Sequence, residues 1–169
     1  MPHAEPSPPR RAEAAALGAV VFAVYALGAS PTILVGDSGE LVAAVHVLGI
    51  PHPTGYPLYV LLGKLWTVCV PIGSVAYRMS LFSAACGALA AALLYRLGRE
   101  DLGVHAVAAA AAALAWAFAP SVWGEANIQR VYTLNAVFVA LATRAVVAWW
   151  RRRDAASLGW VAFWCGLGA

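Results

Sequence analysis

The sequence has very little charge: only 11% of its 169 residues are Asp, Glu, Lys or Arg, whereas 62% are hydrophobic. A soluble domain carries about 25% charged residues, so a soluble globular protein is excluded. Lysine is almost missing, since Lys64 is the only one, and the other positive charges are clustered arginines. Such clusters suit the orientation of a membrane protein, and no basic surface with interleaved aromatic residues suggests nucleic-acid binding. We therefore predict an all-α, polytopic bundle of transmembrane helices, whose partners include membrane lipids and no nucleic acid.

Cysteine is also scarce. Cys69, Cys86 and Cys165 lie in apolar segments without CxxC spacing, which indicates small buried side chains rather than a disulfide framework or a metal site. The HxxH and HExxH spacings are absent as well, so the sequence predicts no metal ligands and leaves a need for a divalent metal open. The patterns GxxxxGKS, GxGxxG and GxSxG are missing too, which excludes soluble nucleotide chemistry.

The apolar segments define the expected organisation. We predict that residues 1–13 form a disordered cytoplasmic tail and that 14–169 are the N-terminal part of a transmembrane domain. A transmembrane helix needs about 20 apolar residues. Segment 14–35 is long enough to span, which favours an uncleaved first helix over a cleaved signal peptide. The predicted spans are 14–35, 79–95, 104–121, 132–149 and an incomplete 157–169.

The arginines decide whether segment 57–72 spans. Its helix would be about 24 Å long, against a hydrocarbon core of about 30 Å. If it spanned, four arginines would lie inside and five outside, against the positive-inside rule. If it lies on the outer surface, seven basic residues are inside and three outside. We therefore predict amphipathic outer-surface helices at 38–48 and 57–72 and a cytoplasmic N-terminus. The seven are Arg10, Arg11, Arg96, Arg99, Arg151, Arg152 and Arg153, and the three are Lys64, Arg78 and Arg130.

Asp37 and Glu40 stand three residues apart, directly after the first apolar segment. Acids just outside a bilayer core must be solvated or paired, and they often mark a functional site. One interpretation is a capping box, with Asp37 as N-cap and Glu40 in the first turn of the surface helix. The other is a catalytic site, because residues with this spacing share a helix face and a carboxylate there can accept the proton of an acceptor hydroxyl. The two interpretations are compatible.

The motif HPTGYP contains His52 and Tyr56. Each proline keeps the preceding residue out of the helical region, so we predict a rigid extended turn, with Pro57 opening the next helix. This turn is either a structural connector or a display of His52 and Tyr56 to a polar ligand. Lys64 and Arg78 either meet lipid phosphates or bind the phosphate of a lipid-linked substrate.

The loop before the 132–149 span is rich in polar residues for so apolar a chain. It is either an ordinary interfacial loop, anchored by Trp123 and Tyr132 and containing a Glu125–Arg130 ion pair, or the lining of a site. In the predicted topology this loop lies on the outer face with the other polar segments.

These motifs together resemble a known group of proteins. The sequence resembles the N-terminal half of polytopic glycosyltransferases of the C superfamily, and in particular a bacterial family of membrane proteins related to protein O-mannosyltransferases. The resemblance covers roughly residues 15–165, and that family usually has an acid just before the Val-Tyr of the last motif, where this chain has Arg130. The motifs are GDSGE (36–40), HPTGYPLYVLLGKLW (52–66), AYRM (76–79), YRLGR (95–99) and WGEANIQRVYTLN (123–135).

The resemblance implies a fold like that superfamily's and an activity. Such enzymes take a sugar from a polyprenyl-phosphate carrier and pass it to a protein, lipid or glycan on the outer side of the bacterial inner membrane. The resemblance makes mannose a candidate sugar, and the sequence itself identifies neither the sugar nor the acceptor. A carboxylate in the first outer loop is the catalytic base, which is Asp37 by motif position, with Glu40 as a second candidate. The residues that would bind substrate are His52, Tyr56, Lys64, Arg78, Glu125 and Arg130.

Two other classes of function remain alternatives. A transporter or flippase-like subunit would line a path through the bundle with charges, but Arg144 is the only charge deep in a predicted span, close enough to its inner end to extend to the interface. A non-catalytic membrane subunit or an inactive fragment is suggested by the last apolar segment, which has 13 residues. We expect this chain alone to be inactive, since the enzymes it resembles have many more helices.

Overall fold

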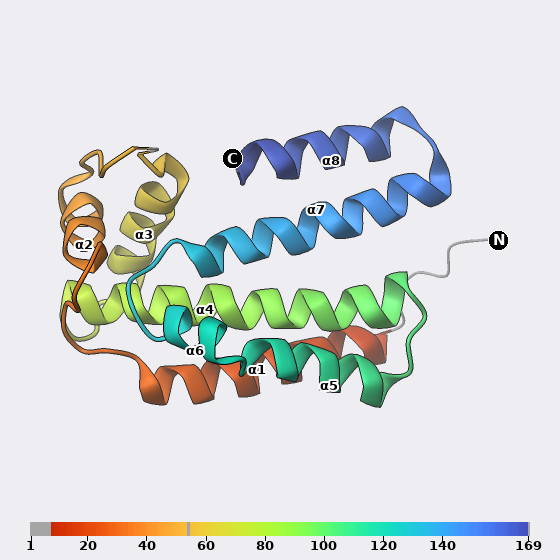
Figure 1. Ribbon diagram of the computed structural model, residues 1–169, viewed down its shortest axis with the longest axis horizontal. Helices are drawn as coiled ribbons and strands as arrows, with labels where there is room; N and C mark the ends of the chain where they lie inside the picture. The colour runs from red at the N-terminus through yellow and green to blue at the C-terminus, as the bar shows by residue number, and fades with distance from the viewer. Residues whose placement is uncertain (1–7, 54, 169) are drawn as a thin grey trace.

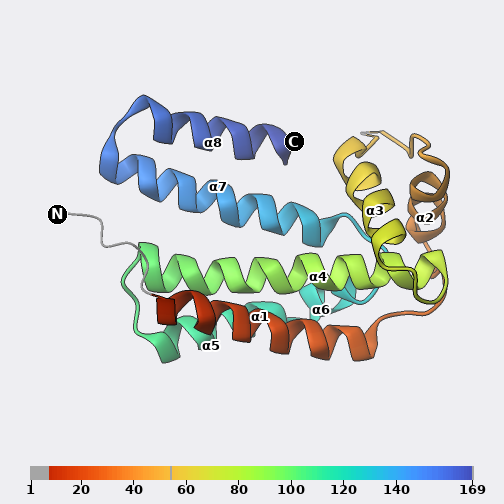
Figure 2. The same cartoon turned by 180° about the vertical axis from the view of Figure 1, so that it is seen from behind.

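A computed structural model describes residues 8–53 and 55–168, with side chains from residue 11 onward. The described chain forms eight α-helices and one π-helical turn and contains no strand, which confirms the all-α prediction. In Figure 1 and Figure 2 the central helix α4 (Val75–Arg96) lies between α7 (Tyr132–Arg152) on one side and α1 (Pro8–Gly28) on the other. The remaining elements are α2 (Ser38–Val47), α3 (Pro57–Cys69), η1 (Leu97–Asp101), α5 (Ala106–Ala117), α6 (Pro120–Ala126) and α8 (Ala155–Leu167).

Three helices of the described chain are long and apolar enough to cross a membrane, and they make this a membrane protein. They are α1, α4 with its η1 extension, and α7. Helices α5 and α6 are bent by 65° at a short break between them. If the bent pair is counted as one span, it is the fourth. The break precedes Pro120, which cannot continue the hydrogen-bond pattern of α5 but fits the first turn of α6.

Small residues let α1 and α4 pack closely against each other. A Cβ at Gly87 would come 2.9 Å from a ring carbon of Tyr25, and a Cβ at Gly18 would come 3.3 Å from Cβ of Ala92. The hydroxyl of Tyr25, which belongs to α1, donates a hydrogen bond to the Ala117 carbonyl of α5 at 2.6 Å. Close approach through small residues and buried polar bonds is typical of helix packing in membranes. The bundle is therefore built around α4.

Helices α2 and α3 lie side by side at one end of α4 (Figure 1). Tyr59 of α3 packs edge-on against Phe82 of α4, with ring centroids 5.7 Å apart. At the same end, Oγ of Ser74 donates to the Pro31 carbonyl at 2.9 Å, so the end of α1 and the start of α4 are neighbours. The chain leaves α1 and enters α4 at one end of the bundle, as it would if 57–72 does not span.

The opposite end of the bundle carries an ion-pair network. Nη2 of Arg144 lies 2.7 Å from Oε2 of Glu100, and its Nε lies 2.5 Å from Oδ2 of Asp101. Glu100 also pairs with Arg96, at 2.9 Å. Two carboxylates of the α4–α5 connection therefore hold Arg144, and its extension to the membrane interface stays a prediction.

Several expected boundaries differ from the structure. The first helix covers Pro8–Gly28 rather than 14–35, because Pro31 disfavours helical geometry at the residue before it. Residues 8–13, expected to belong to a disordered tail, are helical, while residues 1–7 lie outside the described chain. Helix α4 begins at Val75 instead of 79 because the Ser74 hydroxyl caps it. Of the three cysteines expected to be buried, Cys86 is buried, whereas Cys69 and Cys165 are exposed on the chain surface.

Candidate active site

Buried polar bonds fix the loop before α7 to α4. The Gln129 side chain is fully buried, and its amide nitrogen lies 2.6 Å from Oγ of Ser80 and 3.2 and 3.1 Å from two backbone carbonyls. The Ser83 hydroxyl bonds the backbone N–H and the carbonyl of Arg130, at 3.3 and 3.2 Å. Because an unpaired buried polar group is costly, these bonds hold the backbone of Arg130 in one place beside α4.

The Arg130 side chain reaches from this loop to Asp37. Its Nη1 donates to Oδ2 of Asp37 at 2.7 Å, and its Nε lies 3.9 Å from Oε2 of Glu125. The Arg130 side chain is 17% exposed and that of Asp37 is 49% exposed. Two carboxylates thus face one guanidinium. Oδ1 of Asp37 has no hydrogen-bond partner among the described residues, so this oxygen is available to a ligand.

Gly36 makes this ion pair possible. Its φ of +93° is a conformation that residues with a side chain rarely adopt. A Cβ at this position would lie 2.7 Å from Nη2 of Arg130. The glycine of the GDSGE motif therefore provides both the turn before α2 and the space for the guanidinium.

The capping box does not form. Asp37 occupies the N-cap position of α2, but its side chain makes no capping bond. Its carboxylate is turned to Arg130, and Glu40 is bonded to His52. Of the capping box, only the backbone position of Asp37 is present. The catalytic interpretation of the two acids stays a prediction.

Glu40, His52 and Tyr56 form a second group. The Glu40 carboxylate accepts the backbone N–H of His52 at 2.6 Å and lies 2.8 Å from its Nδ1. The side-chain bond first, and then the backbone bond, lower the pKa of Glu40. A carboxylate cannot donate, so Nδ1 of His52 carries a proton and donates it to Glu40. The His52 and Tyr56 rings meet edge to face, with centroids 5.5 Å apart.

The turn before α3 departs from the extended shape predicted for it. Tyr56, which precedes Pro57, adopts left-handed geometry with φ 43° and ψ 52°. Proline excludes right-handed helical geometry at the preceding residue, and Tyr56 meets that restriction in the left-handed rather than the extended region. Such a conformation costs about 1–2 kcal/mol, and it directs the Tyr56 ring toward His52.

Lys64 and Arg78 bind backbone carbonyls. Nζ of Lys64 donates to the His46 carbonyl at 2.5 Å, near the end of α2. The guanidinium of Arg78 donates to three carbonyls at the end of α3 and in the turn after it, at 3.0 to 3.2 Å. The structure thus brings neither residue to the Asp37 group, and it uses both to satisfy the open ends of helices.

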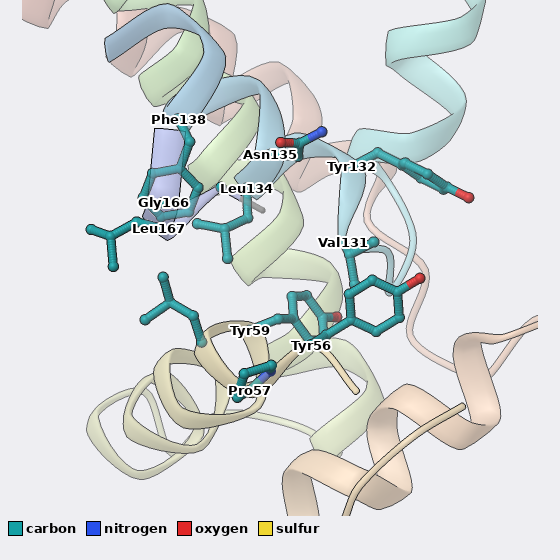
Figure 3. Close-up of a pocket in the computed structure, with 12 residues that line it drawn as sticks. Tyr56, Pro57, Tyr59, Val131, Tyr132, Leu134, Asn135, Phe138, Gly166 and Leu167 are labelled. Carbon is teal, nitrogen blue, oxygen red and sulfur yellow. The ribbon is translucent and has the colours of Figure 1, made fainter. Parts of the chain in front are cut away.

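A cavity of about 410 Å³ is lined by Tyr56 of the second group and by residues that follow Arg130 in the chain. The ring of Tyr56, which lines the cavity, contacts the ring of His52. Val131 and Tyr132, which also line it, directly follow Arg130 in the sequence. Its lining is mostly apolar and aromatic, with Asn135 of α7 among the few polar groups (Figure 3). The Tyr59 hydroxyl is buried without a partner among the described residues, and burial raises its pKa.

Sequence reasoning missed Tyr59 and Asn135 as residues of this cavity. Tyr59 stands in an apolar stretch with the spacing of a core residue, and it does pack against Phe82. Asn135 lies in the first turn of α7, three residues after Tyr132, and a polar side chain in so apolar a helix is the signal that could have found it.

The sequence of this chain matches a known protein family. The family model described as the protein O-mannosyl-transferase TMEM260 N-terminal domain matches residues 37–169. The chain belongs to this family. The matched range begins at Asp37 and includes each of the eight residues that sequence analysis proposed for the site. No solved structure matches this chain.

Two curated relatives of the TMEM260 N-terminal domain family agree with this assignment. The protein O-mannosyl-transferase TMEM260 of Mus musculus is 39% identical over 158 residues, which are 90% of this chain and 22% of the mouse protein. The corresponding protein of Dictyostelium discoideum is 30% identical over 120 residues, or 70% of this chain and 14% of that protein. The chain thus spans about a fifth of the mouse relative's length and is homologous to its N-terminal part.

The family assignment confirms the expected relationship to protein O-mannosyltransferases. The finer assignments, to a bacterial family, to the C superfamily and to a polyprenyl-phosphate donor, stay predictions. Within residues 8–53 and 55–168, no three side chains of His, Cys, Asp or Glu converge as metal ligands do.

Proposed function

We propose that this chain is the N-terminal part of an inverting membrane glycosyltransferase that moves mannose from a polyprenyl-phosphate carrier to a protein acceptor. The N-terminus lies in the cytoplasm and the reaction takes place at the outer face of the inner membrane. One observation carries the proposal: the half-exposed Asp37 carboxylate is held by Arg130 through one oxygen and leaves the other free. The residue after Arg130, Val131, lines a cavity of about 410 Å³.

Asp37 is the general base of the proposed reaction. The acceptor hydroxyl oxygen forms a bond to the anomeric carbon of the sugar while the bond from that carbon to the phosphate oxygen breaks. Oδ1 of Asp37 takes the hydroxyl proton, and the bonding electrons leave with the lipid phosphate. Glu40 is a poorer base, because both its oxygens already bind His52. We assign Glu40 the role of orienting His52.

Arg130 is the cation best placed for the donor phosphate. It bonds directly to the proposed base, whereas Lys64 and Arg78 are occupied by backbone carbonyls. A fixed positive charge beside the leaving group stabilises the negative charge that develops on it. Glu125 balances the guanidinium from the other side. The aromatic cavity of about 410 Å³ suits a sugar ring and the first isoprene units, while His52 and Tyr56 shape its entrance.

A donor assay tests the proposal. Membranes that contain the longest natural polypeptide carrying this chain are incubated with radiolabelled polyprenyl-phosphate mannose or with GDP-mannose, together with a peptide rich in serine and threonine. We expect label in the peptide from the lipid donor, with inversion at the anomeric carbon. Transfer from GDP-mannose after the endogenous polyprenyl phosphate has been extracted, or no transfer by a correctly inserted protein, contradicts the proposal.

Thiol labelling tests the proposed location. Single cysteines replace Val35, Ile50, Gly124 and Leu102, which are all exposed, in a chain whose native cysteines are changed to alanine. We expect an impermeant reagent to label the first three positions in intact cells and Leu102 only after permeabilisation, because Leu102 lies at the other end of α4. Labelling of Val35 and Gly124 from opposite sides would divide the site and contradict the catalytic assignment.

A further inference from the structure

A second cavity lies at the opposite end of α7 from Arg130. It has a volume of about 250 Å³ and opens between α7 and α8. Helix α7 contributes Leu141, Ala145 and Ala148 to its lining, and α8 contributes Trp160 and Trp164. Arg152 and Ser157 line the end at the α7–α8 turn. The proposed sugar transfer uses none of these residues.

The cavity is apolar along most of its length. The rings of Trp160 and Trp164 stack at a centroid distance of 6.1 Å and form one wall. Ala145 and Ala148 leave space opposite them because their side chains are small. The result is a slot between α7 and α8. These two helices run antiparallel (Figure 1).

Arg152 supplies positive charge at the open end of this slot. Its guanidinium has no hydrogen-bond or ion-pair partner among the described residues. Its neighbours are occupied: Arg151 donates to the Asp101 carbonyl, and the guanidinium of Arg153 lies 3.9 Å from the centre of the Trp150 ring. The Asp154 carboxylate accepts the backbone N–H of Ser157 at 2.7 Å.

The other charges that face the cavity are balanced. The positive charge of Arg144 is matched by Glu100 and Asp101, at 2.7 and 2.5 Å. Arg152 therefore sets the sign of the charge at the mouth of the slot, in a turn that has three arginines and one aspartate. A site with a cationic mouth and an aromatic, apolar interior fits an anionic amphiphile.

We propose that this cavity holds one anionic phospholipid, with its phosphate on Arg152 and an acyl chain between the wall of Trp160 and Trp164 and the small residues of α7. Basic pockets between transmembrane helices bind anionic head groups, and tryptophan favours the depth at which head groups meet acyl chains. The bound lipid would join α7 to α8. This site is independent of the proposed sugar transfer, so either assignment can fail without the other.

Native mass spectrometry of the purified chain in detergent tests the proposal. The chain is mixed with phosphatidylglycerol or with phosphatidylcholine of the same acyl chains. We expect one phosphatidylglycerol to be retained in preference to phosphatidylcholine. Arg152→Ala should weaken its binding about fivefold, the amount expected for one basic residue at a lipid surface.

Arg153→Ala is the matched control, because it removes the same charge one residue away while Arg153 does not line the cavity. It should weaken binding less than twofold. Ala148→Phe fills the slot without a change of charge and should also displace the lipid; circular dichroism checks its folding. Equal loss for Arg152→Ala and Arg153→Ala, unchanged binding to Arg152→Ala, or equal retention of both lipids would overturn the proposal.

Discussion

Asp37→Asn should reduce mannosyl transfer by about 100- to 10,000-fold, the contribution typical of a general base. The asparagine keeps an oxygen that can accept the hydrogen bond from Nη1 of Arg130, so the loop should stay in place. What is lost is the ability to take the acceptor proton. The measurement is the initial rate of transfer from polyprenyl-phosphate mannose by the longest natural polypeptide that contains this chain, at equal amounts of inserted protein.

Two further variants separate chemistry from structure at Asp37. Asp37→Glu keeps a carboxylate and should retain more activity than Asp37→Asn. Glu40→Gln keeps the Asp37 group intact and should lose less, since Glu40 only orients His52 in our proposal. If Asp37→Asn transfers sugar as fast as the unaltered protein, or if Glu40→Gln is the more damaged of the two, Asp37 is not the base.

Gly36→Ala tests the same ion pair without touching a charge. The new Cβ would lie 2.7 Å from Nη2 of Arg130 at a backbone φ of +93°. Left-handed geometry at a residue with a side chain costs about 1–2 kcal/mol, so we expect displacement of Arg130 and about a tenfold loss of transfer. Gly39→Ala is the control, because a Cβ there meets only Ile33, at an ordinary 3.5 Å. Equal activity of the two variants would separate the ion pair from catalysis.

The positions of the polar segments could be predicted in outline because the length of apolar segments and the distribution of arginines largely determine the topology of a membrane protein. Apolar length and arginine placement alone predict long helices, with the GDSGE motif and the loop of Glu125 and Arg130 on one face. The structure brings Asp37 and Arg130 together at 2.7 Å although 93 residues separate them in the sequence. The expected ion pair between Glu125 and Arg130 is also present. Its atoms, Nε of Arg130 and Oε2 of Glu125, are 3.9 Å apart, which is longer than the contact to Asp37.

The partners of individual side chains could not be predicted in the same way. Local spacing suggested a capping box for Asp37 and Glu40, but tertiary partners, Arg130 and His52, take both carboxylates. The sequence allows Arg78 to bind phosphate because it does not show that α3 ends beside it with open carbonyls. Competition between local and long-range partners depends on packing, which a pattern of residues does not contain.

Arg144→Met should destabilise the chain by about 3 kcal/mol, toward the lower end of what removal of one partner from a buried ion pair costs. Arg144 bonds Glu100 at 2.7 Å and Asp101 at 2.5 Å, and the Glu100 side chain is only 7% exposed. Without the guanidinium, Asp101 loses its partner while Glu100 keeps Arg96. The measurement is the unfolding free energy in mixed detergent micelles, followed by circular dichroism. Thr143→Ala, an exposed change one residue away, should cost much less.

A double-mutant cycle shows whether this loss comes from the uncompensated carboxylate. Asp101→Asn combined with Arg144→Met removes both charges, so the pair should cost less than the sum of the two single changes. This result would mean that the network fixes α7 against the α4–α5 connection, far from the proposed active site, and that Arg144 is a structural residue rather than part of a transport path. Additive costs, or a loss for Arg144→Met no larger than that for Thr143→Ala, would mean that the carboxylates find water when the arginine is gone. In that case packing of apolar residues alone, and not the ion pairs, holds this end of the bundle together.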